Sequence, residues 1–116
     1  NRYVNELQGI FTVNENSTAG MQLALQDIGK AGKIAFVGFD SSAPFIEGLR
    51  DGQLQGFVVQ NPFNMGYLAI KTMIDHLQGR TVERHTDTGV SIITPDNIDS
   101  PESKERLNPP VGVYLK

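Results

Sequence analysis

The sequence has no cysteine, no cluster of basic residues and no long apolar run. Without cysteine, a disulfide scaffold and thiolate chemistry are excluded, although the cellular compartment stays open. A nucleic-acid surface needs a basic stripe that displaces counterions from phosphates. The net charge of −3 and the scattered Lys and Arg residues therefore argue against nucleic acid as a partner. No apolar run approaches the roughly 20 residues that a membrane helix requires.

Catalytic and cofactor motifs are also missing from the sequence. We find no GxGxxG, GxxxxGK[ST], HExxH or GxSxG pattern. The two histidines, His76 and His85, lie in helical and polar contexts that favour a surface role. The sequence therefore predicts a protein that is not an enzyme, with no catalytic residues, no metal site and no cofactor.

What the sequence does contain is one design repeated three times. Short apolar strands are predicted at residues 9–13, 34–39 and 56–59, and each is followed by one polar residue and a helix-start signal. Strands that are apolar throughout are typical of a parallel sheet covered by helices on both faces. A length of 116 residues with 39% apolar residues fits one compact domain of roughly 100–150 residues.

Helical signals fill the intervals between these strands. Helices are expected over residues 18–28, from Pro44 to about residue 50, and over residues 61–77, where capping residues or prolines precede apolar residues at helical spacing. Residues 89–94 are a further strand candidate, and residues 99–116, with three prolines, are expected to be a surface-hugging coil. The predicted fold class is α/β: three layers, with a parallel sheet and alternating strands and helices.

The polar residues at the three strand ends are the candidate site. In an open α/β sheet, ligands bind beyond the carboxyl ends of the strands, so Asn14, Asp40 and Gln60 are expected on one rim. Asn14 and Asp40 are also residue types that cap helices, whereas Gln60 is a weaker capper. Together, two amides and a carboxylate can donate to and accept from a polyhydroxylated ligand. None has an adjacent nucleophile or base in the sequence, so the set is suited to holding a ligand.

These residues carry a resemblance to a known family. Residues 9–14, 37–40 and 48–52, with Gln60-Asn61-Pro62, resemble the C-terminal part of the type I periplasmic sugar-binding proteins, the ribose-binding-protein class. The resemblance covers residues 8–98. It implies a receptor that closes two hinged lobes around a monosaccharide or related polyol and delivers it to the membrane permease of an ABC importer. It also implies sugar contacts at Asn14, Asp40 and Gln60. Glu15 stands where the family usually has aspartate.

The resemblance also implies a location and a division of the chain. The receptor would be periplasmic, or extracellular and tethered to the membrane. Residues 1–98 would be a partial C-terminal lobe, residues 88–97 a hinge strand that leaves its sheet, and residues 99–116 a tail. The N-terminal half of the receptor would be missing, and no signal peptide is predicted within these residues. The strand at residues 10–13 would then be an open edge beside apolar Leu7 and Met21, through which the isolated chain would self-associate.

Two alternatives stay open at this point. The effector-binding domain of LacI-type transcriptional repressors has the same fold and a similar Gly38-Phe39-Asp40 motif. A flavodoxin-like enzyme or receiver domain would want a phosphate loop or an acidic cluster after the first strand, where residues 14–16 supply one carboxylate. The sequence around Asp51-Gly52 and Gln60-Asn61-Pro62 resembles transport receptors more than repressors.

Overall fold

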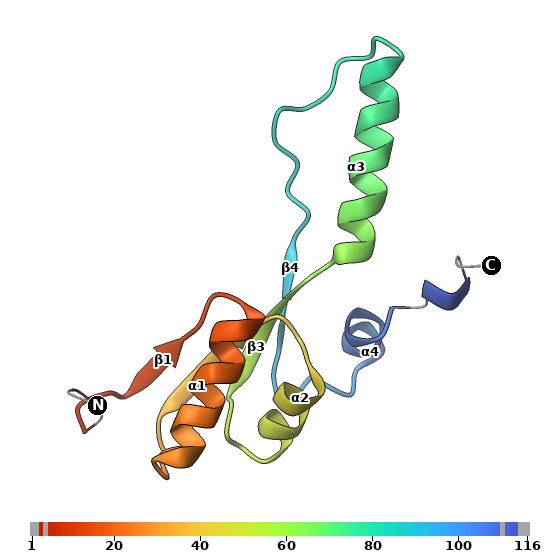
Figure 1. Cartoon of the computed structure of the whole chain (residues 1–116). Helices are drawn as coiled ribbons and strands as arrows, with labels where there is room; N and C mark the ends of the chain where they lie inside the picture. Colours follow the sequence, from red (N-terminus) through yellow and green to blue (C-terminus); the bar gives the residue numbers. More distant parts are fainter. Residues whose placement is uncertain (1–2, 4, 110, 114–116) are drawn as a thin grey trace.

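The computed structural model describes residues 3, 5–109 and 111–113 of the chain. It contains one four-stranded sheet in the order β1-β2-β3-β4, in which the first three strands are parallel (Figure 1). This mixed α/β fold confirms the predicted class. The strands are β1 (Gly9–Phe11), β2 (Ala35–Phe39), β3 (Gly56–Gln60) and β4 (Val90–Ile93). The helices are α1 (Glu15–Asp27), α2 (Ala43–Arg50), α3 (Pro62–Leu77) and α4 (Pro101–Leu107), followed by a 3-10 turn, η1 (Val111–Val113).

The fourth strand corrects the expectation of a hinge strand that leaves the sheet. β4 runs antiparallel to β3 and pairs with it from Phe57↔Ile93 to Gln60↔Val90. After α3, the chain returns through residues 78–89 toward the body, and it meets the free edge of β3. Backbone donors and acceptors on that edge require partners, and β4 supplies them. The sheet is therefore mixed, with its antiparallel strand at one end.

One face of the sheet holds the hydrophobic core. Phe36 and Phe57 are fully buried and Ile93 is 1% exposed, beneath α1 and α2, which lie side by side on this face (Figure 1). Phe45 of α2 contacts Phe57 with ring centroids 6.5 Å apart. On the other face, Phe11 and Ile92 are both 56% exposed. The third layer of the predicted architecture is not supplied by the residues that the structure describes.

The buried side of α1 differs from the apolar spacing that predicted the helix. That spacing places Met21, Ala24, Leu25 and Ile28 on one face, yet the buried residues are Thr18, Gln22 and Leu25. Thr18 and Gln22 can be buried because their polar atoms are paired; Gln22 Nε2, for example, donates to the Pro44 carbonyl at 3.1 Å. Met21, Ala24 and Ile28 instead line an open groove beside β1.

Helix α3 projects away from the body (Figure 1). Asn61 caps it by accepting from the Asn64 amide at 3.0 Å, and Pro62 follows at the first helical position. No residue of α3 is buried, although the helix carries large apolar side chains. The most exposed of these are Tyr67, Ile70, Met73, Ile74 and Leu77. None of the described helices is long and apolar enough to cross a membrane.

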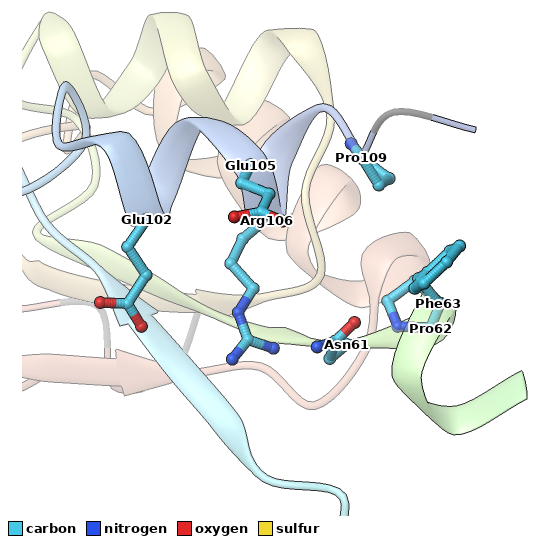
Figure 2. A pocket seen from close by; sticks show the side chains of 7 residues that line it. All are labelled: Asn61, Pro62, Phe63, Glu102, Glu105, Arg106 and Pro109. Atoms are coloured by element: carbon cyan, nitrogen blue, oxygen red, sulfur yellow. The ribbon is translucent and has the colours of Figure 1, made fainter. Parts of the chain in front are cut away.

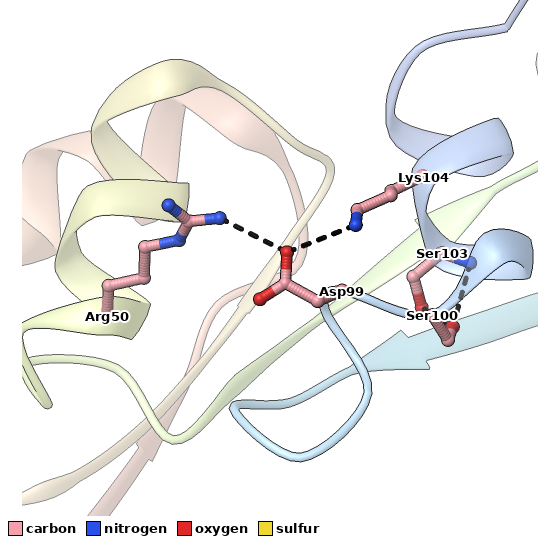
Figure 3. Close-up of polar contacts among 5 residues, drawn as sticks. All are labelled: Arg50, Asp99, Ser100, Ser103 and Lys104. Carbon is pink, nitrogen blue, oxygen red and sulfur yellow. Dashed lines mark hydrogen bonds and ion pairs between the residues drawn. The ribbon is translucent and has the colours of Figure 1, made fainter.

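The predicted coil after residue 98 is wrong for α4, and the cause is local. Ser100 Oγ accepts from the Ser103 amide at 3.1 Å and so caps the helix (Figure 3). Pro101 occupies the first turn, which tolerates proline. Asp99 Oδ1 lies 3.5 Å from both Arg50 of α2 and Lys104 of α4. Ile98 and Leu107 pack against the core. The start of this segment is thus attached to the body, and residues 110 and 114–116 lie outside the described residues.

Candidate functional site

The carboxyl end of β2 is positioned by a close contact with α1. A Cβ added to Gly38 would overlap Thr18 Cγ2, so only glycine lets the helix approach this closely. Thr18 Oγ1 accepts from the Phe39 amide at 3.0 Å and shares a 2.8 Å hydrogen bond with Thr12 Oγ1. The first turn of α1 is thereby held against the ends of β1 and β2.

Asp40 lies where these elements meet. Its φ of 67° is in the left-handed region, which Asp tolerates better than most residues. This backbone turns the side chain toward α1, where Oδ2 accepts from the Glu15 amide at 3.1 Å. The carboxylate therefore lies at the positive end of the α1 dipole, which stabilises its charge. Asp40 does not cap α2, because Ser42 occupies that position.

Asn14 serves the structure as a helix cap. Its Oδ1 accepts from the Ser17 amide at 2.9 Å, and its carbonyl accepts from Thr18 Oγ1 at 2.8 Å. The side-chain oxygen is therefore engaged within α1, and the amide nitrogen of this exposed residue is the group that remains for a ligand.

Gln60 ends β3 and is exposed, directly before the chain enters α3. Gln60 and Asp40 line one cavity of about 300 Å³ beyond the carboxyl ends of β2 and β3. The structure thus brings two of the three predicted site residues into one cavity, and Asn14 is not among its lining residues. The full lining is Glu15, Asp40, Ser41, Val59, Gln60, Pro62, Arg106, Leu107 and Pro109.

Sequence reasoning missed the contribution of the C-terminal segment. Arg106, Leu107 and Pro109 form one wall of the cavity, and a second cavity of about 220 Å³ lies alongside, between α4 and the start of α3 (Figure 2). Ser100-Pro101, a capping residue followed by proline, is the signal that would have predicted α4. No local signal indicates which surface α4 packs against.

The chemistry of the cavity is that of hydrogen bonding to a polar ligand. Carboxylates of Glu15 and Asp40 accept, the guanidinium of Arg106 donates, and the amide of Gln60 does both. The described residues contain no group of three or more His, Asp or Glu side chains arranged to hold a metal ion.

The fold agrees with what comparison with known proteins shows. Residues 1–81 match the model of the family described as "Periplasmic binding protein domain". The chain belongs to this family.

Two relatives are named as sugar-binding proteins. The chain is 30% identical over 69 residues to the D-allose-binding periplasmic protein of Escherichia coli. The aligned segment covers 60% of this chain and 22% of that protein. The chain is 31% identical over 80 residues to the ribose import binding protein RbsB of Bacillus subtilis, covering 68% of this chain and 25% of that protein.

A solved structure matches the arrangement in space. An ABC transporter solute-binding protein from Agrobacterium vitis with bound D-fucose superposes with a TM-score of 0.80 at 41% identity. The match covers 89% of this chain and 36% of that one, so it includes most of the elements described above. The chain spans between about a fifth and about a third of the length of these three proteins.

Proposed function

We propose that this chain is the C-terminal part of the sugar-binding receptor of an ABC importer. In this role the chain supplies one side of a site that holds a neutral monosaccharide by hydrogen bonds and performs no chemistry on it. Asp40, Gln60 and Asn14 are the proposed ligand-binding residues. The observation that carries the proposal is the cavity that Asp40 and Gln60 share at the carboxyl ends of β2 and β3.

The arrangement of α3 supports a two-lobe receptor. The chain leaves the body after Gln60 and returns at β4, and both of these connections lie beside the site. Between them α3 presents Ile70 and Ile74, 59% and 47% exposed, with no cover from the described residues. An apolar helix face of this kind is normally buried against another element. We infer that α3 and residues 78–89 lie in the second lobe, whose remaining residues precede this chain.

This inference revises the expected division of the chain. The hinge would consist of two crossings between the lobes, at Gln60–Asn61 and near residues 88–89. Only the elements before the first crossing and after the second would belong to the C-terminal lobe. Lobe closure around crossings of this kind is a hinge motion. Gln60 would then lie at a crossing and in the site at the same time, which couples sugar binding to closure.

The remaining partners and the location follow from the proposed role. The receptor would deliver its sugar to a membrane permease. Its proposed location is the periplasm, because the E. coli relative is named as a periplasmic protein. The relatives reported above are transport proteins, which favours transport over the LacI-type repressor as the function.

Calorimetric titration of the full-length receptor that contains this segment tests the function. D-ribose, D-allose and D-fucose are the probes, because the relatives are named for them or contain them. Binding of at least one neutral sugar, weakened by Asp40→Asn, is the expected result. A receptor that binds none of these sugars, or binds one with unchanged affinity in Asp40→Asn, contradicts the proposal.

A further inference from the structure

A buried cationic donor without a partner lies at the edge of the site. Nη1 of Arg106 is buried and forms no hydrogen bond with the residues that the structure describes. The ion pairs among those residues use Arg50, Arg80 and Lys104 instead. Burying a donor of a charged group without an acceptor is costly, so folded proteins normally provide one.

The position of Arg106 connects its guanidinium with the site. Arg106 lines the cavity that contains Asp40 and Gln60, and it also lines the smaller cavity beside Asn61. Figure 2 shows its side chain extending from α4 toward Asn61, at the point where β3 passes into α3. A ligand held by Asp40 and Gln60 therefore shares one cavity with this guanidinium.

The charges around the cavity select the kind of ligand. Arg106 is the one cationic side chain among the described residues that line it, whereas Glu15 and Asp40 contribute two carboxylates. Carboxylates only accept hydrogen bonds and a guanidinium only donates them. A hydroxyl group can serve both, because it donates to a carboxylate while accepting from arginine. An anionic sugar would place its charge near two carboxylates, which is unfavourable.

We propose that Arg106 is a further ligand-binding residue of this site, donating from its guanidinium to a hydroxyl or ring oxygen of a neutral monosaccharide. The proposal rests on the proposed function and extends the site to α4, an element outside the sheet. It also gives the C-terminal segment a role in binding, since α4 is the element that carries Arg106 into the cavity.

Titration of the full-length receptor with D-ribose, D-allose and D-fucose provides the test, using Arg106→Met and Arg106→Lys. Arg106→Met keeps an apolar stem and removes the donors, so we expect the sugar affinity to fall about ten-fold or more. Arg106→Lys keeps the charge without the planar fork and should lie in between. Arg50→Met is the matched control, because Arg50 lies 60% exposed in an ion pair with Asp99 and should leave affinity within two-fold.

Monodeoxy analogues of the best-binding sugar separate direct contact from an indirect effect. If Arg106 contacts one sugar oxygen, deleting that oxygen weakens binding to the wild type but produces no further loss in Arg106→Met. Unfolding midpoints of the ligand-free variants establish that each is folded, and Arg106→Lys replaces Arg106→Met in the cycle if the latter is not.

Several results would overturn the inference. Wild-type affinity in Arg106→Met would do so. So would an equal loss of affinity for every analogue in the wild type and in Arg106→Met, because Arg106 would then pair with the second lobe. D-galacturonate binding more tightly than each neutral sugar would contradict the ligand class. A wild-type receptor that binds none of the three neutral sugars defeats the proposed function as well, whereas the other outcomes leave that function standing.

Discussion

At the scale of single residues, Asp40 combines a binding role with an unusual backbone. Its left-handed φ of 67° means that Asp40→Ala strains the turn as well as removing the carboxylate. Asp40→Asn is the sharper change, because Asn tolerates this conformation and keeps the shape of the side chain. We expect Asp40→Ala to weaken sugar binding about ten- to hundred-fold and Gln60→Ala only about two- to ten-fold, since hydrogen bonds to charged groups contribute about 1.5–3 kcal/mol against about 0.5–1.5 kcal/mol for neutral ones.

Titration calorimetry on the full-length receptor measures these differences. Asn14→Ala should also lose less than Asp40→Ala, because the Asn14 side-chain oxygen is already engaged by the Ser17 amide. Asp27→Ala removes an exposed carboxylate at the far end of α1 and is the control that should bind normally. Wild-type affinity in both Asp40 variants would remove Asp40 from the site.

Gly38 controls the approach of α1 to β2, and its replacement tests that contact. In Gly38→Ala the new methyl group would overlap Thr18 Cγ2, and Thr18 cannot rotate without losing its hydrogen bonds to Phe39 and Thr12. We expect a loss of about 1–3 kcal/mol in the free energy of unfolding, measured by denaturant titration of the receptor. The control is Gly20→Ala, on an open face of α1, which should leave the free energy of unfolding unchanged or slightly raise it.

A second substitution makes the Gly38 prediction specific. Thr18→Ser removes Cγ2 while keeping the hydroxyl group, so the double variant Thr18→Ser, Gly38→Ala should regain part of the stability that Gly38→Ala loses. Purely additive losses would show that the contact between these two residues is not the cause.

At the scale of elements, α4 depends on its cap. Ser100→Ala removes the oxygen that accepts from the Ser103 amide, and we expect a local loss of about 0.5–2 kcal/mol. Because α4 carries Arg106 and Leu107 into the cavity wall, sugar affinity should fall in parallel. Hydrogen exchange of the α4 amides, together with calorimetry, measures both effects.

Ser42→Ala supplies the matched control for this cap. Ser42 is also an N-cap serine, at the start of α2, but its side chain makes no capping hydrogen bond. Its replacement should therefore change neither exchange nor affinity appreciably. Normal protection of α4 in Ser100→Ala would contradict the assigned role of the cap.

At the scale of the whole molecule, two apolar surfaces are left open. β1 is an edge strand, as predicted, and the groove beside it is lined by Leu7, Ile10 and Met21 among others. The exposed apolar side of α3 is the second surface. Edges and patches of this kind recruit other chains. We expect the isolated 116-residue chain to self-associate at micromolar concentration, or to need the rest of the receptor, and to bind sugar weakly.

Sedimentation velocity distinguishes these outcomes, and paired lysine substitutions on α3 locate the contact. Ile70→Lys places a charge on the open apolar side and should reduce self-association. Gln78→Lys adds the same side chain at the exposed C-cap of the helix and should not. A compact monomer of the unmodified chain with sub-micromolar sugar affinity would contradict the prediction.

Under the proposed function, the chain forms parts of both lobes of one receptor. The sheet with α1, α2 and α4 has its own core, whereas α3 has none. Under the same proposal, the second lobe would close the cavity and cover the apolar side of α3.

The sequence by itself determined the elements and the position of the rim. The three parallel strands, the helices after them, and the placement of Asp40 and Gln60 at strand ends all follow from signals within a few residues: apolar runs, caps and prolines. Such signals are local, so they can be read without knowing what the rest of the chain does. Only the tertiary structure decided the remainder, because each case depends on distant partners. β4 pairs with β3 because that edge was free. Helix α3 extends away from the body, and α4 brings Arg106 into the cavity that Asp40 lines.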